Sequence, residues 1–143
     1  LDTKEVRIAK KIASHLRESG FVRNGIRQKG LFTNLRAIGW KIEEYHCAQV
    51  SMNLYDLECA PLAKVWEEAR NLANEENTEI VESELIGLIP EKTLLDVGLR
   101  LGEKEKEQQL DKALEHLRFR SFDKTQHILE YNIERHRHLW RSF

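Results

Sequence analysis

The sequence is poor in cysteine, proline, glycine and long apolar runs, and each shortage excludes a class of protein. Two cysteines in 143 residues cannot form a disulfide framework, and their spacing matches no zinc-ligand pair. Two prolines and seven glycines leave no low-complexity linker. No run reaches the roughly 18 apolar residues of a membrane helix. We therefore expect a single soluble, cytoplasmic domain with reduced thiols and no membrane partner.

The charge is nearly balanced, with 23 Lys and Arg against 24 Asp and Glu and a net charge of −1. This balance argues against a nucleic acid or an anionic membrane as the partner. Positive charge is nevertheless concentrated between Gly20 and Gly30, in a segment that we predict to be a loop. The content of hydrophobic residues, 41%, is too high for a disordered chain.

Hydrophobic periodicity predicts an α+β fold. Spacings of three and four predict helices, and strict alternation predicts strands. The expected elements, in chain order, are a helix at 1–19, strands at 35–45 and 48–56 joined as a hairpin at His46, a helix at 61–77, a strand at 79–88, and helices at 90–101 and 110–117. This order is typical of a ferredoxin-like split βαββαβ sandwich whose first strand is missing before Leu1, with extra C-terminal helices.

The second strand carries a row of neutral polar residues, Gln49, Ser51 and Asn53, opposite the apolar residues that must meet the helices. Each of these side chains can donate and accept hydrogen bonds, which suits a polar ligand or another polar sheet. The alternative is a solvated face, although such faces usually carry Lys, Glu and Thr. If the third predicted strand turns Val81 inward, Glu84 shares this face together with Glu82.

Other candidate sites in the sequence are incomplete. His46 and Cys47 are adjacent, so in a strand their side chains point to opposite faces, and we expect a structural role for them rather than that of base and nucleophile. His136 and His138 lie among arginines that repel a cation, so we expect a solvated basic tail and no metal site. Phosphate cradles, HExxH and nucleophile elbows are absent from the sequence. The residues alone therefore give no complete catalytic constellation.

Five segments carry a family resemblance: TKEVRIAKKIA at 3–13, KGLFTNLRAIGWKIEEY at 29–45, AQVSMNLYD at 48–56, SELIGLIP at 83–90 and ILEY at 128–131. QVSMN followed by SELIGLIP is the most specific part. Together the segments resemble the C-terminal subdomain of glutamate formimidoyltransferase, which occurs alone in bacteria or fused to a cyclodeaminase in animals. The resemblance implies a formiminotransferase subdomain at 1–131 and a basic, aromatic tail at 132–143.

The resemblance also implies an activity in histidine breakdown, in which the formimino group of N-formiminoglutamate is transferred to the co-substrate tetrahydrofolate without a metal. In this family two related α/β subdomains enclose a substrate tunnel, and the catalytic histidine lies in the N-terminal subdomain. No residue here inherits that catalytic role. The positions that correspond to the tunnel wall are Gln49, Ser51, Asn53 and Glu84. We expect the N-terminal subdomain as partner, and a homodimer.

The sequence departs from the family pattern at three places. Glu82 replaces a glycine that commonly precedes the Ser-Glu pair, and its charge could repel an anionic folate. Lys124 stands where a proline is common, and residues 132–143 have no counterpart. A stand-alone binding or oligomerisation module, whose missing first strand exposes a sheet edge, is therefore a second interpretation. A pterin-binding protein without transfer activity is a third.

Overall fold

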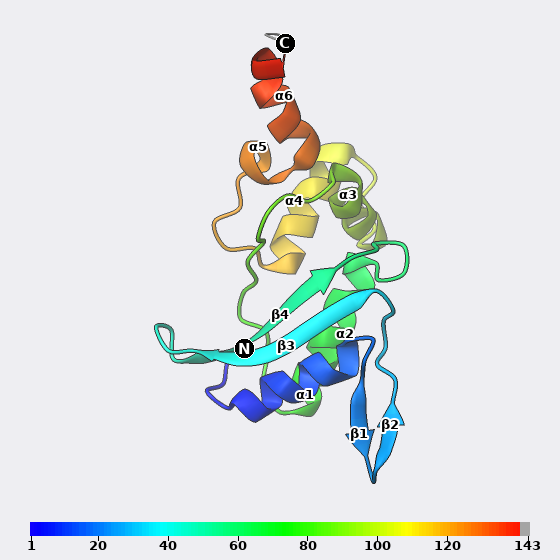
Figure 1. The fold of residues 1–143 in the computed structure, drawn as a ribbon. Coiled ribbons are helices and arrows are strands. Elements are labelled where there is room, and N and C mark those ends of the chain that lie inside the picture. The colour runs from blue at the N-terminus through cyan, green and yellow to red at the C-terminus, as the bar shows by residue number, and fades with distance from the viewer. Residues whose placement is uncertain (141–143) are drawn as a thin grey trace. The chain divides into compact units, whose positions relative to one another are not determined.

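A computed structural model describes the backbone of residues 1–140 and the side chains of residues 1–137. The chain forms two compact units, Leu1–Val81 and Glu82–Phe143, where the sequence indicated one uninterrupted domain. The first unit contains α1 (Val6–Leu16), β1 (Phe21–Arg23), β2 (Ile26–Gln28), β3 (Leu35–Ile42), β4 (Cys47–Leu54) and α2 (Leu62–Glu75) (Figure 1). The second contains α3 (Glu91–Arg100), α4 (Lys106–Leu117), α5 (Lys124–His127) and α6 (Leu129–Trp140). The predicted α+β class is confirmed, and the arrangement is compatible with a ferredoxin-like split fold.

The predicted hairpin is present as the antiparallel pair β3–β4. Its register runs from Leu35 opposite Leu54 to Ile42 opposite Cys47. The turn over residues 43–46 closes at His46, which has a φ of 50°. Because side chains alternate along each strand, this register fixes which residues share each face of the hairpin.

Helix α1 covers one face of this hairpin, and its buried stripe forms the core of the first unit. Small residues on β3 let the helix approach closely. Ala37 is buried beneath it, and a Cβ atom added at Gly39 would lie 2.2 Å from the backbone carbon of Ala9. The larger apolar residues of β3, Ile38 and Trp40, consequently lie on the opposite face.

The first helix is shorter than predicted, because residues before Val6 bind the edge of β4 instead. The amino group of Leu1 donates to the carbonyl of Ala48 at 3.0 Å, and the N–H of Ala48 donates to the carbonyl of Thr3 at 2.7 Å. Backbone groups that satisfy a strand edge are not available for a helical turn. The segment is therefore held against the strand rather than wound into α1.

The basic segment between Gly20 and Gly30 is a hairpin, β1–β2, and the prediction of a loop was wrong. Phe21 pairs with Gln28 and Arg23 pairs with Ile26. Between the strands Asn24 and Gly25 have φ values of 52° and 77°. Two successive positive φ values match the tight hairpin turn for which Asn-Gly is the preferred sequence.

The third predicted strand, at 79–88, was also wrong. Among the described residues the only β-bridge of this segment joins Ser83 to Phe119, and just beyond it a second bridge joins Ile89 to Ile128. Both partners lie in loops of the second unit rather than in β3 or β4, and Gly87, with a φ of 93°, interrupts the extended run. The carbonyl of Glu79 accepts a hydrogen bond from the N–H of Asp2 at 2.9 Å. The alternating pattern therefore reflects single-residue pairing and not membership of a sheet.

A polar cluster ties together three helices of the second unit. The carboxylate of Glu91 accepts a hydrogen bond from the Tyr131 hydroxyl and pairs with the ammonium of Lys106 at 2.8 Å, while the N–H of Glu91 donates to Glu130 at 2.8 Å. Burial opposes ionisation of Glu91, but the hydrogen bonds from Lys106 and Tyr131 outweigh it and lower its pKa. The ionised carboxylate therefore holds α3, α4 and α6 together, and this contribution is lost only as the pH falls through the lowered pKa of Glu91.

The predicted basic tail begins inside helix α6, which continues to Trp140. Arg135 and Arg137 are exposed, and Arg137 pairs with Glu134 at 3.3 Å. The division at 131 and 132 stays a prediction, and the last three residues of the tail lie outside the described part of the chain. No helix within the described range has the length and hydropathy to cross a membrane.

Candidate functional site

The polar row lies on the face of the β3–β4 hairpin that turns away from α1. Gln49, Ser51 and Asn53 occupy alternate positions of β4, and the intervening residues pack toward the helix. Gln49 and Ser51 are half-buried, and Asn53 is exposed. Three neutral groups that donate and accept hydrogen bonds therefore form one line along a regular strand.

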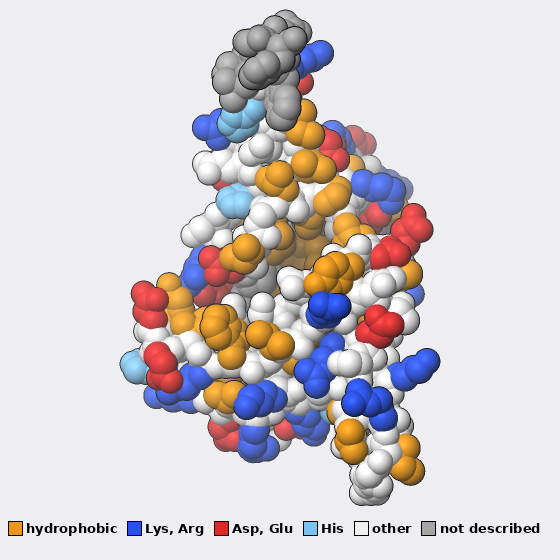
Figure 2. Space-filling view, in the orientation of Figure 1, with side chains coloured by type: hydrophobic (Ala, Val, Ile, Leu, Met, Phe, Trp, Pro, Cys, Tyr) orange, Lys and Arg blue, Asp and Glu red, His pale blue; other side chains and the backbone are white. Residues whose placement is uncertain are grey.

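An apolar row, not singled out from the sequence, runs beside the polar row on β3. Ile38 and Trp40 lie opposite Ser51 and Gln49 and are 58% and 50% exposed. Figure 2 shows hydrophobic side chains exposed along β3. Adjacent large apolar side chains that stay exposed on a sheet are typical of surfaces that contact another molecule or domain.

A cation lies at the far end of the same face. Arg36 is opposite Asn53, and its guanidinium lies 5.4 Å from the ring centre of the exposed Tyr55. Guanidinium groups that stack on aromatic rings are held in orientation while their donors stay free for a carboxylate or phosphate. The face thus combines an amide row, an apolar row and one fixed positive charge.

Glu84 does not lie on this strand face, because its segment forms no strand of the β3–β4 sheet within the described residues. It belongs to the second unit, together with Glu82. Arg120 contacts both carboxylates, with nitrogen–oxygen distances of 2.9 Å to Glu82 and 3.6 Å to Glu84. The shared sheet face predicted for these residues was wrong. The extra negative charge of Glu82 has a positive partner that the sequence did not indicate.

The histidine and cysteine candidates come together in no cluster. His46 is exposed in the hairpin turn and Cys47 is half-buried beside it at the start of β4. The ring of His136 bonds the carbonyl of Asn132 in its own helix, and the side chain of His138 lies outside the described residues. Among the residues that the structure describes, no three His, Cys, Asp or Glu side chains are placed to hold a metal ion.

Comparison with known proteins identifies the family. A family model described as "Formiminotransferase domain" matches residues 1–134. The formimidoyltransferase-cyclodeaminase of Rattus norvegicus is 41% identical over 142 residues, which cover 93% of this chain and 25% of that protein. The corresponding protein of Dictyostelium discoideum is 34% identical over 143 residues, covering 94% of this chain and 26% of its own length.

A shorter relative gives the same result. The glutamate formimidoyltransferase of Streptococcus pyogenes serotype M1 is 38% identical over 98 residues, which cover 68% of this chain and 30% of that protein. The chain therefore spans only a quarter to a third of the length of these relatives. On the extent of the family match, the chain belongs to the formiminotransferase domain family.

Proposed function

We propose that this chain is the C-terminal part of a folate-dependent glutamate formimidoyltransferase, which moves the formimino group of N-formiminoglutamate to tetrahydrofolate in histidine degradation. Its membership of the formiminotransferase family supports the transfer reaction. Its coverage of 25% of the rat relative supports the presence of a further, N-terminal subdomain in the working enzyme. We also propose that the enzyme is a cytoplasmic homodimer.

The face of the β3–β4 hairpin that α1 leaves uncovered is the observation that carries the proposal. In the first unit α1 packs on the other face, and Ile38 and Trp40 stay about half exposed. The amide row provides donors and acceptors for the polar edge of a pterin, and the indole of Trp40 provides a flat apolar surface. Neutral amides orient an anionic folate without repelling it. We propose that this face is one wall of the substrate tunnel.

The residues of this face bind and orient, and the proton transfers take place elsewhere. In the reaction a folate nitrogen forms a bond to the formimino carbon, and the bond from that carbon to the glutamate nitrogen breaks. The folate nitrogen loses a proton and the released glutamate amine gains one, which requires a general acid and base. We assign that role to the histidine expected in the N-terminal subdomain. On its own, this chain would hold the substrates without catalysing transfer.

Glu84 is a second candidate for the tunnel wall. Its motif, SELIGLIP, is the support for this role, and its carboxylate lies 3.6 Å from the guanidinium of Arg120. A carboxylate that shares an arginine with Glu82 carries less uncompensated charge than an isolated one. The repulsion of folate expected from Glu82 is correspondingly reduced.

The alternative function is a stand-alone binding or oligomerisation module with the same fold. The exposed apolar row on β3 also suits a protein partner. Mass spectrometry of the native protein separates the two functions. A natural chain of about 16.9 kDa favours the module, whereas a chain at least twice that mass favours the enzyme.

Alanine substitution of the amide row tests the proposed function. In the full-length enzyme, replacing Gln49 and Asn53 together by alanine is expected to lower kcat/KM at least about tenfold, because each lost hydrogen bond to bound substrate costs roughly 1 kcal/mol. The matched control replaces the exposed Asn71 and Gln108, which lie on helices, by alanine. If kcat/KM of the double variant were unchanged for both substrates, the amide row would not be part of the substrate site.

A further inference from the structure

A basic groove follows the outer side of α1 and the first strand of the β1–β2 hairpin, entirely within the first unit. Its volume is about 730 Å³, which lies within the range of small-molecule sites. Figure 2 shows Lys and Arg side chains gathered along α1 and the base of this hairpin. The lining residues are Arg7, Lys10, Lys11, Ser14, His15, Arg17, Phe21, Val22 and Arg23.

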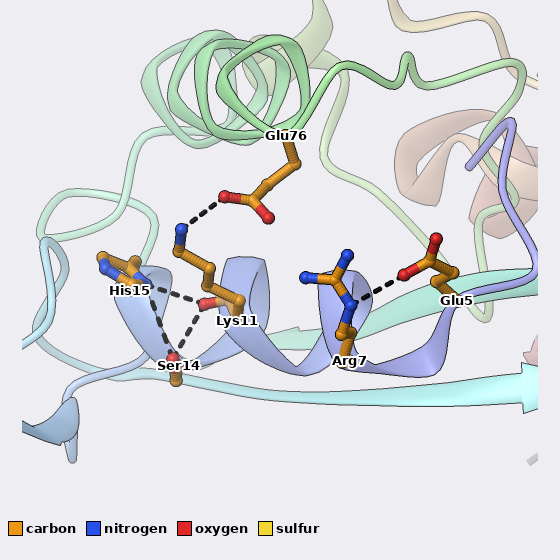
Figure 3. A network of polar contacts seen from close by, with 6 residues as sticks. All are labelled: Glu5, Arg7, Lys11, Ser14, His15 and Glu76. Carbon is orange, nitrogen blue, oxygen red and sulfur yellow. Dashed lines mark hydrogen bonds and ion pairs between the residues drawn. The ribbon is translucent and has the colours of Figure 1, made fainter.

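Carboxylates neutralise only part of this charge. Arg7 pairs with Glu5 at 2.7 Å, and Lys11 pairs with Glu76 at the end of α2 (Figure 3). Within the described residues neither Lys10 nor Arg23 forms an ion pair. The groove therefore keeps an excess of three positive charges, although the whole chain has a net charge of −1. Clustered cations in a concave surface raise the local concentration of anions.

Two features of the groove are held in place before any ligand arrives. Arg17 donates to the carbonyls of Gly20 and Ala37 at 3.2 and 3.4 Å, which fixes its guanidinium at the end of α1. The rings of His15 and Phe21 stack with their centres 4.1 Å apart. A positioned cation and a rigid aromatic wall reduce the entropy lost on binding.

We propose that this groove binds an oligophosphate chain, either free or as part of a nucleotide. Three arginines line it, and the planar guanidinium fork matches phosphate oxygens two at a time. A chain of three phosphates carries enough charge to neutralise the excess, whereas a single carboxylate does not. The His15–Phe21 pair offers a stacking surface for a base if the phosphates belong to a nucleotide. The proposal does not depend on the transferase activity, because the β3–β4 site lies on the other side of the hairpin.

Titration of the 143-residue chain with inorganic tripolyphosphate and with ATP tests the proposal. We expect saturable chemical-shift changes in the backbone amides of Lys10, Ser14 and Arg23 with both ligands. A nucleotide as the natural source would bind more tightly than tripolyphosphate and would add shifts at His15 and Phe21. Equal affinity would assign the site to the phosphate chain alone.

Charge-reversal variants establish whether the groove itself is responsible. Replacing Lys10 and Arg23 together by glutamate is expected to weaken binding of tripolyphosphate at least tenfold. The matched control replaces Lys64 and Arg70 by glutamate, which changes the net charge equally at exposed positions of α2. If the first variant does not fold, the same comparison with glutamine at the four positions keeps the test intact.

Three results would overturn the proposal. Equal weakening in both variants would show unspecific attraction to a charged chain. Shifts that fail to saturate, or that fall outside the groove, would show that no site is formed. Tighter binding of an acidic peptide than of tripolyphosphate at equal charge would assign the groove to a carboxylate-bearing partner.

Discussion

Replacing Gly39 by valine is expected to unfold the first unit. A Cβ atom at this position would lie 2.2 Å from both the carbonyl carbon of Ala9 and the backbone nitrogen of Lys10, far inside van der Waals contact. Backbone cannot rotate out of the way as a side chain can, so α1 would have to leave the sheet. Overpacking a well-packed core typically costs 1–3 kcal/mol, and displacing a whole helix costs roughly 3 kcal/mol or more.

Denaturant unfolding of the whole chain measures this effect. The control places the same valine at Ser51, on the uncovered face of the paired strand, where we expect a change within about 1 kcal/mol. The variant with valine at residue 39 should lose the chemical-shift dispersion of the first unit or unfold at a much lower denaturant concentration. An unfolding midpoint equal to that of the control would mean that α1 does not lie against Gly39.

The isolated chain is expected to show no formimidoyltransferase activity. The described residues bring no histidine together with a partner that could orient it as a general base on the β3–β4 face. Removal of general acid and base groups alone typically costs 10²–10⁴-fold in rate. Under the proposed function the opposite wall of the tunnel also belongs to the N-terminal subdomain, outside these 143 residues.

Co-expression with the N-terminal part of the same enzyme provides the measurement. We expect glutamate release from N-formiminoglutamate to be undetectable with the isolated chain and to appear when both parts are present. The N-terminal part alone is the control, and it should also be inactive because it lacks the amide row. Turnover by the isolated 143-residue chain would contradict the division of roles proposed here.

Local sequence patterns predicted the elements whose stability is local. The α1 stripe, the hairpin at His46 and the helices that begin after Pro61 and Pro90 are confirmed. Each depends on periodicity or on a proline that fits the start of a helix. The prediction failed at 79–88. There Ser83 forms a bridge with a single loop residue, Phe119, more than 30 positions away. Such long-range pairing leaves no local signal.

The candidate site was predicted in part. Alternation alone identified the amide row of β4, and the register places its members on one face. The exposed positions of Ile38 and Trp40 were not predicted, because apolar residues in a strand are normally assigned to the core. The small residues that alternate with them, Ala37 and Gly39, were the available signal, since only small side chains let a helix lie close to a strand. The ion pairs of Arg120 connect it to Glu82, 38 positions away, and to Glu84, 36 positions away, and could not be predicted from the sequence.

The nearly neutral net charge of the sequence did not indicate that positive charge is concentrated in one groove. The balance of charges argued against any polyanionic partner, yet α1, its C-cap residue Arg17 and β1 place five basic side chains along one groove. The Asn24–Gly25 turn pairs the two halves of the basic segment as the β1–β2 hairpin, and its first strand lines the groove together with α1. Net charge describes the average surface, whereas binding depends on how the fold distributes the charges.

Protection of an engineered cysteine by bound folate shows whether the β3–β4 face lines the substrate tunnel. A Ser51→Cys variant of the full-length enzyme would be alkylated with and without a stable folate, and the rate followed by peptide mass spectrometry. The native Cys59, which is exposed and donates to Asp56 at 3.1 Å, is the internal control. We predict that folate slows alkylation at position 51 at least tenfold and leaves Cys59 unchanged. Equal rates at position 51 with and without folate would contradict the assignment of this face to the substrate tunnel.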